Sequence, residues 1–177
     1  MGWYDDKFEG WHRDVKVGDM DKGHAGLQLL KAIISTVPGV PCIYQGDEYG
    51  VPGANDPDNR DMMTFQCEND YQVREFEQTK ALFHARRNSV PLNYGDLRTL
   101  YVDDQAWVFL RHYMGDWTIV ALNVRTNTKT ITVSLPAFAK CGNLETAVAT
   151  EGAAVKCLGE GKIEVTLPAY GYIIANK

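Results

Sequence analysis

The sequence has no long apolar run and no excess of basic residues, and each of these absences excludes a class of partner. Its longest apolar stretch is far shorter than the ~20 residues that a membrane-spanning helix needs. The formal net charge is −5, and Lys and Arg are scattered along the chain instead of forming a basic surface for nucleic acid. We therefore expect neither a membrane nor nucleic acid as a partner.

Metal-ligand patterns are missing as well. The cysteines show no CxxC or CxxxC spacing and the histidines form no i, i+4 pair; these residues are Cys42, Cys67, Cys141, Cys157, His12, His24, His84 and His112. We therefore expect no metal site and no cofactor. Cys42 lies in an apolar run and is expected to be buried, whereas a Cys141–Cys157 bridge stays open. Residues 1–6 lack the basic and apolar segments of a secretory signal, which leaves localisation open.

The first half of the chain contains two helix-like patterns, an apolar run and a long polar loop. Periodic apolar residues predict a helix over about residues 21–37, capped by Asp19 or Asp21, and a second helix over about 71–88. The apolar run Val40–Tyr44 does not alternate, which is typical of a strand covered on both faces. Residues 46–70 lack periodicity, and structureless loops of that length are usually functional. Residues 1–20 are expected to be a loop with one helical turn near Trp11.

The second half reads as short strands separated by turns. The β-rich segments lie at residues 100–102, 106–110, 118–122, 130–133, 162–167 and 170–174. This spacing predicts an antiparallel sandwich or barrel that begins near residues 89–95. We expect Trp107 to be buried in the core of such a sandwich. Trp117, which follows a turn, is more open and could belong to a surface platform for sugars.

The order of these elements and several motifs resemble the C-terminal end of the α-amylase superfamily, glycoside hydrolase family 13. The segment Pro38–Gly50 resembles the last strand of that family's barrel. Asn55–Arg60, followed by Met62–Phe65, resembles the loop of the neopullulanase and cyclomaltodextrinase branch, closest to the starch-utilisation enzymes of gut bacteria. Further matches are the final barrel helix at residues 75–88, two domain C strands at 107–111 and 119–123, and the last strand at 167–172.

The resemblance implies a mixed fold with two domains. Residues 1–90 would be the incomplete C-terminal end of a (β/α)8 barrel, with two helices, one buried strand and its long loop. Residues 91–177 would be an antiparallel β-sandwich, the domain C of amylases.

The resemblance also implies an α-glucan hydrolase whose catalytic groups lie outside this chain. Retaining glycosidases need two carboxyl groups about 5 Å apart. In the family, the nucleophile Asp, the acid/base Glu and the stabilising Asp follow barrel strands four, five and seven. None of the motifs that carry them occurs here. No catalytic residue is therefore assigned, and we expect the chain alone to be inactive.

Candidate sugar contacts lie in and beside the predicted loop. The resemblance places Asp56 and Arg60 next to the donor subsites, where a carboxylate accepts from vicinal hydroxyls and a guanidinium donates to them. The alternative is an internal Asp–Arg clamp. Tyr44 either lines a sugar subsite or fills the barrel. We expect Glu48, with Asp47, to anchor the loop, with substrate contact as the alternative for Glu48; as adjacent strand residues, the two cannot face each other as a catalytic pair.

Two functions remain open at this point. The chain is either the C-terminal portion of an enzyme that acts on α-1,4-glucan oligosaccharides, or a stand-alone carbohydrate-binding or assembly module. The Val40–Tyr44 strand would need parallel neighbours that the chain does not supply. If the chain folds alone, we therefore expect it to cover the apolar surface as a homodimer or by strand exchange.

Overall fold

The computed structural model describes residues 2–3, 6, 8–13, 16–54 and 56–177. It divides into two compact parts. The first contains the residues up to Gln28 together with Cys42–Lys80, and the second contains Leu29–Pro41 together with Ala81–Lys177. The domain boundary at residues 90 and 91 remains a prediction.

The first part holds the N-terminal segments, the long loop and the first turns of two long helices. Its elements are β1 (Gly2–Trp3), η1 (Glu9–Trp11), β2 (Lys16–Val17), the start of α1 (Met20–Thr36), η2 (Asp58–Arg60) and the start of α2 (Asp70–Arg87). The strands β1 and β2 pair antiparallel. The helical turn predicted near Trp11 and both predicted long helices are confirmed.

Both long helices begin at a side-chain cap. Asp19 Oδ1 accepts a hydrogen bond from the backbone N–H of Lys22 at 3.0 Å, and Asn69 Oδ1 accepts one from the N–H of Gln72 at 3.0 Å. Each cap satisfies an N–H group that has no partner inside its helix. Of the two caps that the sequence allowed for α1, Asp19 is the one observed.

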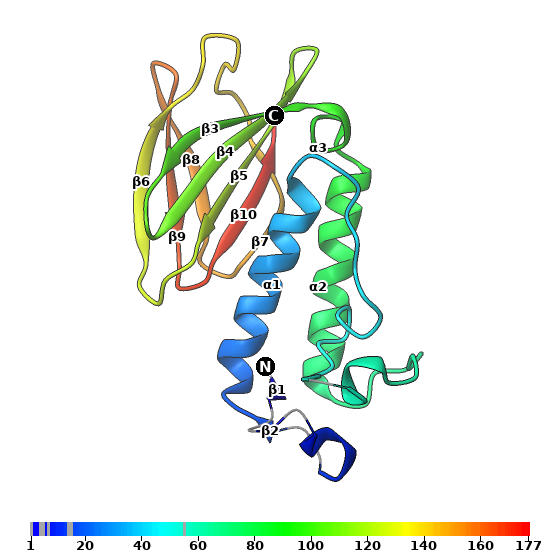
Figure 1. Cartoon of the computed structure of the whole chain (residues 1–177). Helices are drawn as coiled ribbons and strands as arrows, with labels where there is room; N and C mark the ends of the chain where they lie inside the picture. The colour runs from blue at the N-terminus through cyan, green and yellow to red at the C-terminus, as the bar shows by residue number, and fades with distance from the viewer. Residues whose placement is uncertain (1, 4–5, 7, 14–15, 55) are drawn as a thin grey trace. The chain divides into compact units, whose positions relative to one another are not determined.

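The second part contains two antiparallel sheets that pack face to face, as predicted (Figure 1). The five-stranded sheet has the order β3-β4-β5-β10-β7, and the three-stranded sheet has the order β6-β9-β8. The strands are β3 (Asp96–Val102), β4 (Ala106–Tyr113), β5 (Asp116–Asn123), β6 (Lys129–Ser134), β7 (Glu145–Ala149), β8 (Ala154–Gly159), β9 (Lys162–Leu167) and β10 (Tyr172–Asn176). Alternate side chains of both sheets form the core between them, among them Val108, Leu110, Ile119, Ile163 and Val165.

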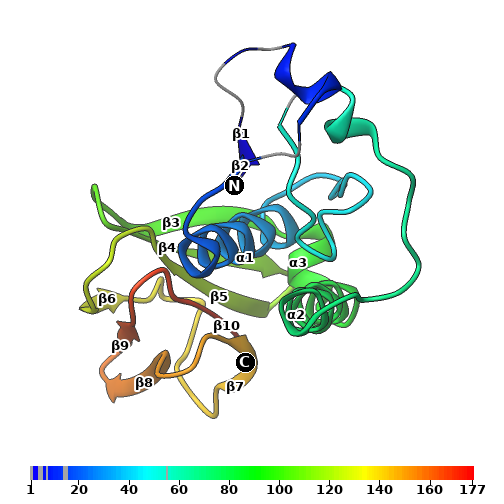
Figure 2. The same ribbon diagram turned by 90° about the horizontal axis from the view of Figure 1, so that it is seen from below.

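Helical turns cover the other face of the five-stranded sheet. Strand residues Phe109, Val120, Leu122, Tyr172 and Ile174 pack there with Leu29 and Ala32 of α1, Leu82 of α2 and Leu92 of the short helix α3 (Val90–Tyr94). Figure 2 shows α1 and the three-stranded sheet on opposite sides of the five-stranded sheet. The second part is thus three layers, with an apolar core on each side of its central sheet.

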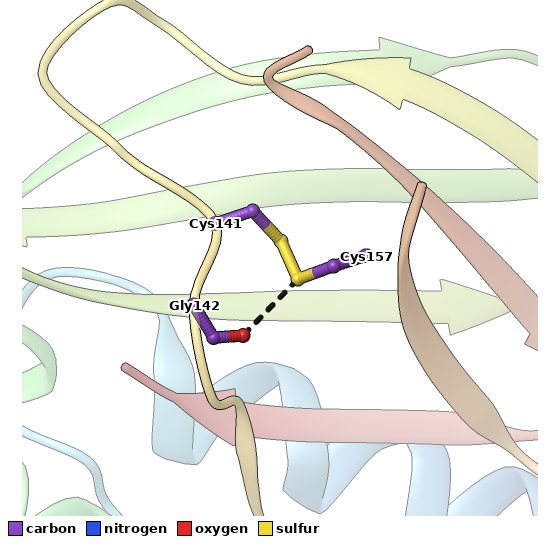
Figure 3. The surroundings of a disulfide bond; sticks show 3 residues. All are labelled: Cys141, Gly142 and Cys157. Carbon is purple, nitrogen blue, oxygen red and sulfur yellow. Dashed lines mark hydrogen bonds between the residues drawn. A yellow bond between two sulfur atoms is a disulfide. The ribbon is translucent and has the colours of Figure 1, made fainter. Parts of the chain in front are cut away.

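A disulfide joins Cys141, which precedes β7, to Cys157 in β8, with Cα atoms 6.0 Å apart (Figure 3). The bridge that the sequence left open is therefore present. Cys157 Sγ also lies 3.2 Å from the carbonyl oxygen of Gly142. This is a packing contact, because a disulfide sulfur has no proton to donate.

The predicted buried strand at Val40–Tyr44 is wrong. These residues form no strand, and Val40 is 95% exposed. A buried parallel strand needs neighbours that pair with it on both sides, and no described strand of this chain pairs with the segment. Cys42 is accordingly exposed, not buried.

Two features of the β-rich half also differ from expectation. Trp117 is only 1% exposed, because β5 is a central strand and the residue already lies between the sheets; Trp107 is partly buried. The strands β7 and β8 were not predicted from the sequence. Both are edge strands with largely unburied side chains, so neither shows the alternation of a half-buried strand.

Candidate functional site

A tight turn shapes the start of the long loop. The backbone N–H groups of Tyr49 and Val51 both donate to the carbonyl of Gly46, at 3.1 and 3.0 Å, and Gly50 N–H donates to Asp47 O at 3.1 Å. Gly46 and Gly50 have φ angles of +96° and +70°, a region that L-residues with side chains rarely adopt. The glycines of this segment are therefore what allows the chain to reverse here.

The carboxylates of Asp47 and Glu48 both accept hydrogen bonds from this turn. Asp47 Oδ2 lies 3.3 Å from the N–H of Tyr44, and Glu48 Oε2 lies 2.8 Å from the N–H of Gly46. Each carboxylate thus satisfies a backbone group of the turn that carries it. These contacts agree with the loop-anchoring role expected for both residues, which itself remains a prediction.

The loop is closed at its base by a side chain. Gln45 Nε2 donates to the carbonyl of Asp61 at 2.8 Å, so that residues 45–61 form one closed loop. Tyr44 lies just before this closure, and the residue is 57% exposed. Among the described residues, no hydrogen bond joins the Tyr44 ring to the loop. Tyr44 is therefore accessible to solvent.

Asp56 and Arg60 form an ion pair near the end of the loop. Arg60 Nε lies 3.1 Å from Asp56 Oδ1, and the two side chains are 73% and 47% exposed, respectively. The ion pair expected for the alternative, an internal Asp–Arg clamp, is thus present, and both side chains are still exposed to solvent. Asp58, between them on η2, has a buried Oδ2 atom with no hydrogen-bond partner among the residues that the structure describes. Asp58 lies within the Asn55–Arg60 motif, but the motif assigned it no sugar contact.

A second polar site, between the first turns of α1 and α2, was not expected. It is a hollow of about 190 Å³ lined by Asp21, His24, Ala25, Gln28, Tyr71, Arg74 and Glu75. Its floor is Glu75, whose side chain is 1% exposed and whose Oε1 atom lies 3.0 Å from both His24 Nδ1 and Gln28 Nε2. The i, i+4 spacing of His24 and Gln28 on α1 was the only available sequence signal for this arrangement.

The rim of the hollow is built around Tyr71. Its ring stacks on His24 with centroids 4.9 Å apart, and the Arg74 guanidinium lies 4.5 Å from its centroid. The Tyr71 hydroxyl donates to Asp21 Oδ1 at 2.8 Å. This hydrogen bond and the negative charge of Asp21 raise the pKa of Tyr71, so that the phenol stays protonated.

Neither a metal site nor a membrane span appears in the described part of the chain. No group of three or more His, Cys, Asp or Glu side chains there could hold a metal ion. None of the described helices is both long and apolar enough to cross a bilayer.

Residues 95–169 match the family described as the α-amylase C-terminal domain. Over 163 residues, the chain is 30% identical to a cyclomaltodextrinase from Geobacillus thermopakistaniensis, covering 89% of this chain and 25% of that enzyme. It is 35% identical over 114 residues to neopullulanase 2 of Thermoactinomyces vulgaris, covering 63% of this chain and 19% of that protein.

Solved structures extend this likeness to the fold. A debranching enzyme from Nostoc punctiforme superposes with a TM-score of 0.75 at 29% identity, over 86% of this chain and 31% of that one. A crystal of that enzyme soaked with acarbose superposes with a TM-score of 0.72 at 26% identity, over 90% of this chain and 30% of that one.

The chain spans between 9% and 25% of the length of the curated relatives that it matches. The order of secondary-structure elements along this chain, helices followed by antiparallel sheets, is the same as in the matching region of the debranching enzyme. Residues 95–169 are therefore similar to the α-amylase C-terminal domain, and the chain resembles the C-terminal region of the α-glucan hydrolases of glycoside hydrolase family 13.

Proposed function

We propose that this chain is the C-terminal portion of a retaining α-glucan hydrolase, and that its 45–61 loop contacts the sugar while other segments supply the catalytic carboxylates. Within the family we place it in the neopullulanase and cyclomaltodextrinase branch. The relatives above support this placement, as does the Asn55–Arg60 motif. The substrates would be α-1,4-glucan oligosaccharides.

The accessible Asp56–Arg60 pair carries this proposal. Its carboxylate can accept from a sugar diol, and its guanidinium can donate from the N–H groups that the Nε–Oδ1 contact leaves unused. The Arg60 and Asp56 side chains are 73% and 47% exposed, so a sugar can reach them without opening a core. In this proposal Tyr44 offers an aromatic face beside the loop, and Asp47 and Glu48 hold the loop's first turn.

Calorimetric titration with maltotriose and acarbose tests the sugar contact. Asp56→Ala and Arg60→Ala should each weaken binding about tenfold, because each removes one charge-assisted hydrogen bond worth roughly 1.5 kcal/mol. Glu77→Ala and Lys80→Ala remove a comparably exposed ion pair of α2 and serve as matched controls. Equal affinities in all four variants would contradict the assigned contact.

Activity on maltooligosaccharides and pullulan tests the other half of the proposal. The purified chain should release no reducing sugar, because its sequence contains none of the motifs that carry the family's catalytic carboxylates. Turnover by this chain alone, lost in Asp56→Ala, would show that the machinery is present after all.

We also propose that the chain on its own self-associates through the segment around Val40. Val40 is 95% exposed, which is unusual for a large apolar residue. Such residues gain free energy when a second copy covers them. Sedimentation velocity at micromolar concentration should detect a dimer, and Val40→Asp should shift it to monomer. A wild-type monomer would reject this proposal.

A further inference from the structure

Three consecutive residues of the long loop dock on one face of α2. The carbonyl oxygen of Glu48 lies 3.4 Å from Thr79 Oγ1, whose proton goes to the closer Glu75 carbonyl at 2.7 Å, and Tyr49 stacks on Phe76 with ring centroids 5.3 Å apart and planes 10° apart. Gly50 then lies directly against Glu75 and against His24 of α1. Since Glu75, Phe76 and Thr79 lie within about one helical turn, the loop's first turn is held by a single surface of the helix.

The contact at Gly50 leaves no room for a side chain. A Cβ atom there would lie 2.8 Å from His24 Cε1 and 3.0 Å from Glu75 Cγ. The φ of +70° already favours glycine. The backbone therefore approaches the buried His24 and Glu75 side chains more closely than any other residue type would permit.

Glu75 is also the point at which α1 joins this arrangement. Its Oε1 atom lies 3.0 Å from His24 Nδ1 and 3.0 Å from Gln28 Nε2. Because a carboxylate oxygen only accepts, Nδ1 of His24 carries the proton and donates to it. The Glu75 side chain is 1% exposed and that of His24 is 10% exposed, so water does not compete for these hydrogen bonds.

The docked turn continues into the segment that carries Asp56 and Arg60. Gly53 lies against the backbone of the η2 turn, where a Cβ atom would come within 3.4 Å of Asn59 Cα and of the Asp58 carbonyl. Gln45 closes the loop by its bond to Asp61. A displacement of residues 48–50 would therefore be passed on to η2.

We infer that Glu75, with its donors His24 and Gln28, positions the 45–61 loop, and that sugar contact by Asp56 and Arg60 depends on this buried cluster. Glu75 is a positioning residue, since it touches the loop at Gly50 and its side chain is only 1% exposed. The consequence for sugar rests on the proposed function, whereas the effect on the loop does not.

Hydrogen–deuterium exchange tests the effect on the loop without any sugar. The readout is the exchange of the backbone N–H groups of Tyr49, Gly50 and Val51, with those of β5 as an internal reference for global unfolding. Glu75→Ala and Gly50→Ala should each speed loop exchange about tenfold or more while β5 stays protected. Glu77→Ala, an exposed neighbour on α2, is the matched control and should change neither region.

Conservative replacements distinguish an effect on the position of the loop from an effect on the stability of the whole fold. Glu75→Gln keeps an acceptor for Gln28, and His24→Asn places an amide N–H near the position of Nδ1, so both should retain most of the loop protection that Glu75→Ala and His24→Leu lose. Unchanged loop exchange in Glu75→Ala would overturn the inference. Equal loss of protection in the loop and in β5 would also overturn it, because the cluster would then serve only global stability.

Maltotriose titration of the same variants completes the test. Glu75→Ala should weaken sugar binding by about the factor seen for Asp56→Ala, although Glu75 is buried. If the wild-type chain binds no sugar but loop exchange still responds to Glu75→Ala, the proposed function fails and the positioning role stands. If sugar binding responds to Asp56→Ala and not to Glu75→Ala, the dependence of sugar contact on the cluster is rejected.

Discussion

Asp103 accepts four hydrogen bonds at the turn between β3 and β4. Its Oδ1 atom accepts from the N–H groups of Gln105 and Ala106 at 2.9 and 2.8 Å. Its Oδ2 atom accepts from the Tyr101 hydroxyl at 2.5 Å and from the Lys129 ammonium at the start of β6. All four donors favour the ionised carboxylate. The bond from Lys129 has the largest effect and the one from Tyr101 the next, and together they hold the pKa of Asp103 far below its usual range.

This depressed pKa predicts a pH-dependent stability. The contribution of Asp103 is fully present above the pKa of the unfolded chain, about 3.9, and is lost as the pH falls toward the folded value. Asp103→Asn should therefore lower the urea midpoint at pH 7, and the difference from wild type should shrink by pH 3. Urea unfolding at both pH values checks this, with Asp104→Asn as the exposed neighbour control. A difference that grows on acidification would contradict the sign.

The C-terminal end of α1 is capped by arginines from other elements. Arg86, on α2, donates to the carbonyls of Ser35, Val37 and Gly39 at 2.9, 3.0 and 2.5 Å. Arg111, on β4, donates to the Thr36 carbonyl and to Gly95. The carbonyls at a helix end are unpaired and carry partial negative charge, which these guanidiniums neutralise. Burial lowers the pKa of both arginines, although arginine remains charged in proteins.

Arg86→Met should therefore destabilise the second part by about 2–4 kcal/mol, because it removes three hydrogen bonds and leaves the buried Ser35 carbonyl without this donor. Chemical denaturation measures the change. Arg87→Met is the matched control, since Arg87 is the exposed next residue of the same helix and should change stability by less than about 0.5 kcal/mol. Equal effects of the two substitutions would show that the cap at α1 is unimportant.

The sequence predicted elements well where periodicity or alternation was strong. Both long helices and the strands from β3 to β6, β9 and β10 follow from such patterns. It failed where a neighbour decides the outcome: Val40–Tyr44 has the composition of a buried strand, yet no described strand pairs with it. Sequence motifs indicated Asp47 and Glu48 as candidate loop anchors, and Asp56 and Arg60 as candidate sugar contacts. They could not indicate the Glu75 cluster, because His24 and Glu75 are 51 residues apart in the sequence and meet only in the folded chain.

At the scale of the whole molecule, the Cys141–Cys157 disulfide links two different sheets. Cys157 lies in an edge strand of the three-stranded sheet, and Cys141 precedes the edge strand β7 of the five-stranded sheet (Figure 3). The bridge closes a loop with a sequence separation of 16 residues that includes all of β7. It therefore restrains an edge that short strands with few buried side chains hold only weakly.

Reduction of this bridge should lower the free energy of unfolding by about 3 kcal/mol, as expected for a loop of roughly 15 residues. Urea unfolding with and without a reductant measures this, and Cys141→Ser combined with Cys157→Ser should reproduce the reduced state. Cys42→Ser, which removes an exposed free thiol, is the control and should leave the midpoint unchanged. An equal midpoint with and without reductant would mean that the bridge adds no stability.

In a single copy, the exposed segment around Val40 also makes the chain easy for a protease to cut. Proteases bind the segment that they cut as an added strand, and residues 40–44 are not engaged in any described sheet. A cut there would break the covalent link between α1 and α2. Arg86 would still donate to the carbonyl of Ser35 at the end of α1, and Leu29 and Ala32 would still lie in the core. Limited chymotrypsin digestion should therefore yield two polypeptides that migrate together on a native gel and separate only in denaturant.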